Sequence, residues 1–215
     1  MKALWIPLAV LIGIWIAWRV RSRRALLPCP AEFAWLVEIE NPLARATRSE
    51  QIVEQLAPRP GARVMDIGCG PGRVTIPLAR TVGATGEVIA LDIQAGMLAK
   101  VTEKAKKEGI TNVRPMQSDV RGAQISDGSL DAAVMVMAFG EIPEGTSIFP
   151  FIFSALKPGG RLLVAESIFD PHFVSRGKLR KFAQAAGFAE RAYCGNVFGY
   201  SLTFERPDAS CLPPR

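Results

Sequence analysis

The chain predicts an α/β fold in which a mostly parallel sheet has helices on both faces. Strand-like and helix-like patterns alternate between residues 49 and 187, an order typical of parallel sheets. The segment 130–137 is a near-continuous apolar run, as expected of a strand covered on both faces. Near the end of the chain, Gly195-Asn196 separates two strand candidates, which predicts an antiparallel hairpin. A chain of 215 residues, 49% of them apolar, can bury the core of one such domain with an appendage.

Each element of this fold corresponds to a segment of the sequence. Strands are expected at 63–67, 87–91, 112–117, 130–137, 161–165, 188–193 and 197–204. Helices are expected at 49–56, 73–81, 95–108, 148–156 and 178–186. Three of the strand ends carry acids, Asp66, Asp92 and Asp119. Ligands of open parallel sheets bind beyond the carboxyl ends of the strands, so these acids mark the expected site.

A glycine-rich turn follows the first strand, with Gly68, Gly70 and Gly72 at every second position and the small Cys69 between them. Glycine lacks the Cβ that would hold a ligand away from the backbone, and it adopts positive φ readily. The helix expected to start near Arg73 would turn its free N–H groups toward the same ligand. The turn therefore predicts a polar, nucleoside-like ligand.

Several ligand and partner classes are excluded by the same sequence. The third glycine of the NAD fingerprint would fall at Arg73, and the Gly-Lys-Ser/Thr end of a P-loop is absent. Four cysteines without paired spacing and one histidine argue against a metal site. Five of the basic residues precede residue 25, and the rest of the chain has 21 bases against 20 acids. The net charge of +6 therefore does not indicate a nucleic-acid-binding surface.

The order acid-x-Gly-x-Gly-x-Gly, then a second and a third strand-end acid, resembles the class I S-adenosylmethionine-dependent methyltransferases over about residues 45–205. In that family the Gly turn wraps the amino-acid part of the cofactor. The acid at the position of Asp92 takes both ribose hydroxyls, and Ser118-Asp119 matches the acid that holds the adenine amino group. The stretch 156–164 and the terminal hairpin are similar to the family's fifth strand and closing strand pair.

The resemblance implies a Rossmann-like, seven-stranded, mostly parallel sheet closed by the antiparallel hairpin. It implies S-adenosyl-L-methionine as cofactor and S-adenosyl-L-homocysteine as product. The cofactor-binding residues that it implies are Asp66, Gly68, Cys69, Gly70, Gly72, Asp92, Ile93, Met97, Ser118, Asp119, Val120 and Met137.

Structural alternatives remain open for the three acids. Asp92 could be a helix N-cap. The role given to Asp119 could fall to Asp127 or Asp131, which are near it in sequence. Asp66 could chiefly brace the Gly turn by accepting backbone N–H bonds.

Candidate acceptor residues follow the fourth and fifth strands. Phe139 is expected to line the adenine or acceptor pocket, and Glu141 is the carboxylate best placed for the acceptor, with a solvated loop acid as the alternative. His172 is the only histidine and the second candidate catalytic residue, with a surface loop histidine as the alternative. Trp35, in an amphipathic connector, is a third candidate for substrate contact. Methyl transfer from a sulfonium needs alignment first, and a base only when the acceptor loses a proton.

The N-terminal stretch from Ala3 to Trp18 contains no charge and predicts a membrane anchor. Sixteen helical residues span about 24 Å, against roughly 30 Å of hydrocarbon, so Met1 and Val20 are needed to approach a full span. Tryptophans lie near both ends, and four arginines on the C-terminal flank predict that the domain lies on the cytoplasmic side. A cleaved signal peptide is the main alternative, and a soluble core helix is a lesser one.

The expected organisation is an anchor with a basic flank at 1–24, an amphipathic connector at 25–45, the methyltransferase domain at 46–206 and a loose tail at 207–215. The connector either lies on the bilayer, roofs the pocket or packs on the domain as an ordinary helix. Anchor and domain together predict a single-pass, membrane-anchored methyltransferase.

The expected acceptor is lipophilic, either a phospholipid head group or quinone-like. By overall pattern the domain is similar to the ubiquinone/menaquinone C-methyltransferases and to bacterial phospholipid N-methyltransferases, and it departs from both in its N-terminal span. The alternatives are a methyltransferase of a small soluble or thiol acceptor, a non-catalytic tethered cofactor-binding scaffold, and a dinucleotide-dependent oxidoreductase.

Overall fold

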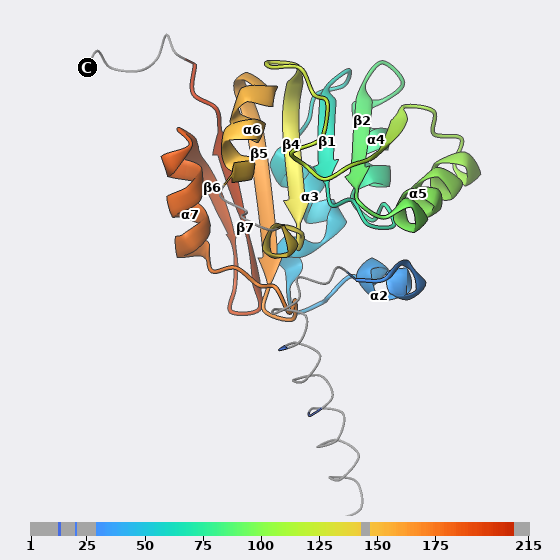
Figure 1. Ribbon diagram of the computed structural model, residues 1–215, viewed down its shortest axis with the longest axis horizontal. Coiled ribbons are helices and arrows are strands. Elements are labelled where there is room, and N and C mark those ends of the chain that lie inside the picture. The colour runs from blue at the N-terminus through green and yellow to red at the C-terminus, as the bar shows by residue number, and fades with distance from the viewer. Residues whose placement is uncertain (1–12, 14–19, 21–28, 143–146, 209–215) are drawn as a thin grey trace, which may run out of the picture.

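A seven-stranded mixed sheet organises the chain, with the strand order β3-β2-β1-β4-β5-β7-β6 (Figure 1). The computed structural model describes residues 13, 20, 29–142 and 147–208. The strands are β1 Arg63–Ile67, β2 Glu87–Asp92, β3 Val113–Gln117, β4 Leu130–Val136, β5 Leu156–Ser167, β6 Ala189–Gly195 and β7 Gly199–Glu205. The first five strands are parallel, and β7 is antiparallel to both β5 and β6. The predicted Rossmann-like α/β sheet with its closing hairpin is confirmed.

Helices cover both faces of this sheet. The α-helices are α2 Ala34–Glu38, α3 Ser49–Leu56, α4 Thr75–Val82, α5 Ala95–Lys107, α6 Ile148–Ala155 and α7 Arg176–Ala185. Short 3-10 helices are η2 Ala31–Phe33, η3 Arg45–Thr47 and η4 Phe139–Glu141. Most of these bounds agree with the expected segments to within two residues, because the apolar periodicity that predicts a helix is also what buries it.

Alternating side chains of each strand enter two different cores. Met65 and Ile67 of β1 pack into the cluster covered by α6 and α7, whereas Val64 packs into the cluster covered by α3 and α4. α5 covers Ala90 of β2 on the same face as α3 and α4. Because side chains of a strand alternate between faces, one apolar run supplies both cores.

Two expected boundaries are wrong. β5 begins at Leu156 instead of Arg161, because extended backbone follows α6 directly and the Pro-Gly-Gly stretch forms an irregularity where the register to β4 shifts. The terminal turn is also displaced from Gly195-Asn196, since Gly195 still pairs with Tyr200 in the ladder. The chain turns at 196–198, where Asn196 Oδ1 accepts the N–H of Phe198 at 2.8 Å.

The parallel strands give the sheet two distinct edges. The carboxyl edge, at which β1 to β5 end, is the lower one in Figure 1, and α2 lies below it. The amino edge is the upper one. The Gly turn, η4, the loop after β5 and the turn between β6 and β7 all belong to the carboxyl edge.

The predicted anchor at 1–24 lies outside the described residues, apart from Gly13 and Val20, and so does most of the predicted tail. Among the described residues, no helix has the length and apolarity needed to cross a membrane.

The connector is fastened across the carboxyl edge by Arg73. The Nη1 of Arg73 donates to Glu40 Oε2 at 3.0 Å and to the carbonyl of Thr47 at 2.8 Å, with the Arg73 side chain only 9% exposed. Glu40 Oε1 also accepts the N–H and the hydroxyl of Ser49 at the start of α3. Burial acts to raise the pKa of Glu40, but the bonds from Ser49 and the charge of Arg73 outweigh it and hold the pKa below its usual value.

Replacing Arg73 with alanine is expected to release this connector. The change removes the donor to Glu40 Oε2 and to the Thr47 carbonyl, which costs about 1–3 kcal/mol of the free energy of unfolding. Amide hydrogen exchange of residues 29–48 should accelerate. Arg80→Ala is the matched control, because its ion pair with Glu108 is exposed and contributes little. Unchanged exchange in the connector of Arg73→Ala would contradict this role.

Candidate active site

The turn after β1 carries three glycines with positive φ, at 67° for Gly68, 52° for Gly70 and 88° for Gly72. Two of them also allow close packing within the protein. A Cβ on Gly68 would lie 2.5 Å from Ala138 Cβ, and one on Gly72 would lie 3.1 Å from the side chain of Val101. At Gly70 the nearest atom is Val37 of the connector at 3.8 Å, an ordinary contact. Gly70 is therefore the position where the turn has room.

Backbone hydrogen bonds join the Gly turn to the end of β2. The N–H groups of Gly68 and Cys69 both donate to the carbonyl of Leu91, at 2.8 and 3.0 Å. The Cys69 side chain is buried, and burial first, then the nearby carboxylates, raise the pKa of its thiol. The thiol therefore stays protonated and acts as a small core group, as the sequence suggested.

Asp66 stabilises the turn through the side chain of Thr75, and not through the backbone N–H groups of the turn that were expected. Its carboxylate is 2% exposed and accepts the hydroxyl of Thr75, the first residue of α4, at 2.6 Å. Burial raises the pKa of Asp66 to about 6. The bond ties the end of β1 to the start of α4, so both ends of the turn are fixed.

Asp92 is brought directly onto the Gly turn. Its Oδ2 accepts the N–H of Gly70 at 2.9 Å, and its Oδ1 accepts the N–H of Gln94 at 2.9 Å. A carboxylate oxygen can accept two hydrogen bonds, so both oxygens of Asp92 can accept a further donor. Burial raises the pKa of Asp92, while these N–H groups act to lower it. The N-cap alternative is wrong, because the N-cap of α5 is Gln94.

Ser118 and Asp119 follow β3 at the same edge. The N–H of Ser118 donates to the carbonyl of Asp92 at 3.2 Å. Asp119 Oδ1 accepts the N–H groups of Gly122 and Arg121, each at 2.8 Å, and the bond from Gly122 is the main cause of its lowered pKa. The two rival acids lie elsewhere: Asp127 accepts the hydroxyl of Ser154, and Asp131 pairs with Lys157 at the amino edge.

The remaining predicted cofactor residues surround this group. Met97 and Val120 are buried, while Ile93 is half exposed. Met137 directly follows β4 with a φ of 53°, one of two positive values among the non-glycine residues that the structure describes. Its N–H donates to the carbonyl of Ala165 at 2.8 Å. A left-handed conformation costs a methionine about 1–2 kcal/mol and is common at functional sites.

Glu141, in η4, and His172, in the loop after β5, lie next to each other at the carboxyl edge. Glu141 Oε1 is 3.6 Å from His172 Nδ1, and Asp170 Oδ1 is 3.7 Å from the same nitrogen. A Cβ on Gly140 would lie 1.9 Å from the carbonyl oxygen of His172, so only glycine allows the two loops to meet. Burial first, then the charge of Asp170, raise the pKa of Glu141 to about 8. The surface-histidine alternative is therefore wrong, because His172 is buried, whereas Glu141 is partly buried, with 27% of its side chain exposed.

Glu166, at the end of β5, was missed. It is 1% exposed, its Oε2 accepts the N–H of Val174 at 3.2 Å, and its Oε1 has no hydrogen-bond partner among the described residues. Burial first, then the charge of Asp170, raise its pKa well above the usual value. The signal was available, since Glu166 is the acid that closes the fifth strand as Asp92 closes the second.

Phe139 lies in the hydrophobic core next to this edge of the sheet. Its ring is 3% exposed and packs edge-on against Phe149 at 5.3 Å, inside the core below α6 and α7. η4 thus turns the ring into this core, and its contact with adenine or the acceptor stays a prediction. Trp35 lies on α2 with 59% of its surface exposed, and its substrate contact stays a prediction.

The carboxyl edge is rich in acids. They are Asp66, Asp92, Glu141, Glu166 and Asp170. The nearby Arg73 is already paired with Glu40. Such an edge suits a ligand with cationic groups and repels a polyphosphate.

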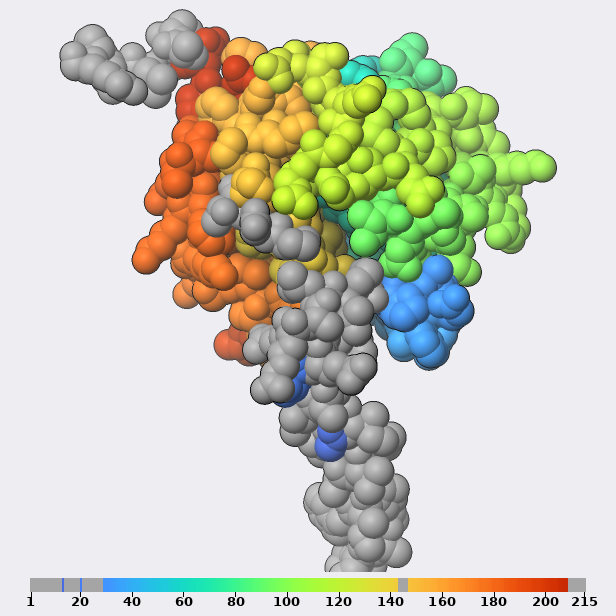
Figure 2. Space-filling model, in the orientation of Figure 1, coloured from blue at the N-terminus to red at the C-terminus, as the bar shows by residue number. Residues whose placement is uncertain are grey.

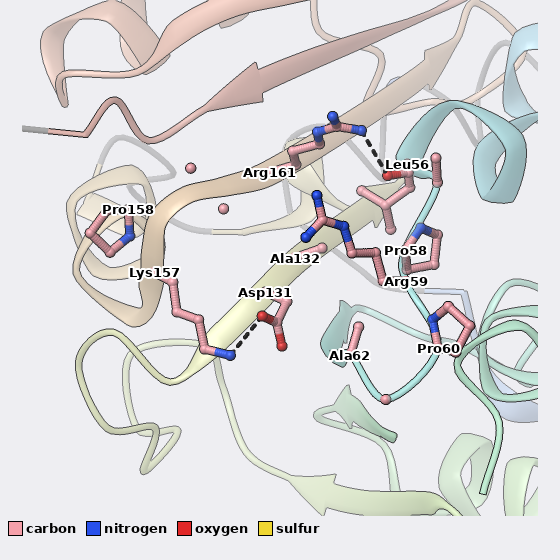
Figure 3. A pocket seen from close by; sticks show the side chains of 14 residues that line it. Leu56, Pro58, Arg59, Pro60, Ala62, Asp131, Ala132, Lys157, Pro158 and Arg161 are labelled. Atoms are coloured by element: carbon pink, nitrogen blue, oxygen red, sulfur yellow. Dashed lines mark hydrogen bonds and ion pairs between the residues drawn. The ribbon is translucent and has the colours of Figure 1, made fainter. Parts of the chain in front are cut away.

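A separate cavity of about 490 Å³ lies at the amino edge (Figure 3). Its walls include Arg59, Arg161 and the Lys157–Asp131 pair. None of the predicted site residues lines it. This cavity is therefore distinct from the site at the carboxyl edge.

Comparison with known proteins gives matches to methyltransferases. Residues 64–160 match the family model of the methyltransferase domain. Over 109 residues the chain is 37% identical to the ubiquinone/menaquinone biosynthesis C-methyltransferase UbiE of Erwinia tasmaniensis, covering 50% of this chain and 43% of that protein. It is 32% identical over 107 residues to the demethylmenaquinone methyltransferase of Lactococcus lactis subsp. lactis, covering 50% and 42%. The match thus spans less than half the length of these relatives.

The fold is also similar to that of a SAM-dependent methyltransferase from Aquifex aeolicus, with a TM-score of 0.73 and 20% identity over 83% of this chain and 99% of that one. The segment matched by the family model contains the Gly turn, Asp92, Asp119 and Glu141. The predicted cofactor, S-adenosylmethionine, is confirmed with the family. Residues 64–160 are therefore a methyltransferase domain of the class I, S-adenosylmethionine-dependent type, resembling that of UbiE.

Proposed function

We propose that this protein is a membrane-tethered methyltransferase that transfers a methyl group from S-adenosylmethionine to a lipophilic, quinone-like acceptor. The main observation in support of this activity is the hydrogen bond that the Gly70 N–H of the Gly turn donates to Asp92 at 2.9 Å. The quinone-like acceptor is supported by the identity to UbiE and to the demethylmenaquinone methyltransferase.

The residues present fit this cofactor. S-adenosylmethionine supplies an electrophilic methyl group on a sulfonium sulfur. Asp92 has acceptor capacity left on both oxygens, which suits the two neighbouring ribose hydroxyls. Asp119 is exposed, and its Oδ2 accepts neither of the two backbone bonds, so it is free for the adenine amino group. The acid-rich edge favours the sulfonium and ammonium charges.

The acceptor side is assigned to Glu141 and His172. Proton loss from a quinol-like acceptor requires a base, and Glu141 is the carboxylate between the Gly-turn region and the loop after β5. Its raised pKa of about 8 matches proton exchange near neutral pH. His172 Nδ1, 3.6 Å away, is placed to orient Glu141 or to pass the proton on.

The membrane tether is supported by the uncharged stretch from Ala3 to Trp18 and the four arginines after it. These features favour a single-pass anchor with the domain on the cytoplasmic side, and partners that are lipids instead of nucleic acids.

Transfer of labelled methyl groups tests this function. Full-length protein with methyl-labelled cofactor and a membrane extract should label a lipid-extractable, quinone-like product. With limiting cofactor, Asp92→Ala should slow labelling at least about tenfold, because a hydrogen bond to a charged group contributes about 1.5–3 kcal/mol. The control Asp127→Ala, on the amino-edge side of the domain, should stay within about twofold of that rate.

Label found only in water-soluble products would contradict a lipophilic acceptor. Label found in phospholipid would show that the acceptor is a lipid head group and not a quinone-like molecule. Binding of S-adenosylhomocysteine without any transfer would indicate a scaffold.

The pH dependence tests Glu141. A base acts when deprotonated, so turnover should rise as pH increases through the pKa of Glu141, which is raised to about 8. The bound sulfonium cation lowers that pKa, so we expect the inflection at or below about pH 8. Glu141→Gln should remove the inflection, whereas Glu103→Gln on the exposed face of α5 should keep it. An unchanged pH profile in Glu141→Gln would rule out this role.

A further inference from the structure

Exposed apolar side chains gather at the carboxyl edge. Among the described residues, all the large exposed apolar side chains except Val20 and Tyr193 belong to the connector or to loops at this edge. We call them the apolar rim: Phe33, Trp35, Leu36, Ile39, Leu43, Ile93, Ile168, Phe169 and Val197. Val197 is 78% and Trp35 is 59% exposed. Apolar surface gathered in this way on a soluble domain marks an interaction site.

The connector part of the rim is held at the edge by several contacts. Gln94 Nε2 donates to the carbonyl of Cys29 at 2.9 Å, and Lys104 pairs with Glu38 of α2 at 2.7 Å. In Figure 2 the blue surface of η2 and α2 protrudes below the domain at this edge. Its exposed aromatic and aliphatic side chains therefore extend outward from the domain.

The other part of the rim is continuous with the connector. The ring of Phe169 stacks on Phe198 with centroids 5.9 Å apart, and the N–H of Ile168 donates to the carbonyl of Phe198 at 3.0 Å. Asn196 Nδ2 donates to the carbonyl of Leu43 at 2.8 Å. The loop after β5, the β6–β7 turn and the connector thus form one connected surface.

We propose that the apolar rim docks on a lipid bilayer, so that the active site opens toward the membrane. This inference rests on the proposed function and adds an orientation to it. The uncharged stretch 3–18 and the arginines at 19–24 immediately precede Cys29, which lies on this edge. A bilayer holding that stretch would lie next to the rim.

The chemistry of the rim fits the interface of a bilayer. Tryptophan and phenylalanine favour the level of the lipid head groups. Exposed cations lie in η3 and at the start of α7, at or near the same edge, and would attract anionic lipids: Arg45, Arg176 and Lys178. Exposed side chains at the amino edge include instead the cations Arg59 and Lys157. A lipophilic acceptor would then enter the site without crossing water.

Single-tryptophan quenching in vesicles tests this orientation. In full-length protein, Trp5, Trp15 and Trp18 are changed to phenylalanine, which leaves Trp35 as the only tryptophan. Two further variants also carry Trp35→Phe, one with Val197→Trp on the rim and one with Arg59→Trp at the amino edge. Each is reconstituted into phosphatidylcholine–phosphatidylglycerol vesicles whose acyl chains carry bromine. Thermal stabilisation by S-adenosylhomocysteine verifies that each variant is folded.

Fluorescence from Trp35 and from the Val197→Trp probe should shift to shorter wavelength and fall by about half or more, whereas the Arg59→Trp probe should be unaffected. An unquenched Val197→Trp probe in protein that binds the cofactor product would overturn the docking and leave the proposed methyltransferase intact. Equal quenching of all probes would overturn it too, as would a dimer that shields Val197 from lipid. Loss of cofactor binding in the unsubstituted protein would instead count against the proposed function.

Discussion

The hydrogen bond from the Gly70 N–H to Asp92 is the constraint on which the site depends. It joins the turn after β1 to the end of β2, and it does so at the one glycine of the turn that has room around it. The Leu91 carbonyl, which accepts the N–H groups of Gly68 and Cys69, adds to the same junction. Because both strands are buried and parallel, the acid at the end of one is held in a fixed position against the backbone of the other.

Burial makes the ionised forms of several acids at this edge unfavourable. Asp66, Glu141 and Glu166 all have pKa values raised by burial, which means that each is more easily protonated than in water. A cationic cofactor offsets that cost, because its charge favours the ionised carboxylates. The same edge carries the strained Met137 and the tightly packed Gly140. Strain and buried charge thus occur together where the chemistry is proposed.

The parallel sheet with its closing hairpin, the Gly turn and the position of Asp92 at a strand end could be predicted from the sequence, because they follow from apolar periodicity and from the conformational needs of glycine. Arg73 was interpreted as the place of a missing glycine and of a helix start, whereas its bond to Glu40 depends on how the connector packs across the edge. The position of Glu166 at the end of β5 could have been predicted, but its burial by the loop after β5 depends on tertiary packing. The direction of the Phe139 ring depends on packing too, because the ring lies in the core with α6 and α7. The expected start of β5 at Arg161 was wrong because the Pro-Gly-Gly stretch is an irregularity within the strand.

The most direct test of this account pairs a cofactor analogue with a variant. The affinity of S-adenosylhomocysteine and of its analogue without the two ribose hydroxyls is measured by calorimetry for the unsubstituted protein and for Asp92→Ala. We expect the unsubstituted protein to prefer the complete ligand by at least about tenfold, and the preference to fall to about twofold in Asp92→Ala. An equal preference in both proteins would contradict the assignment of Asp92 to the ribose.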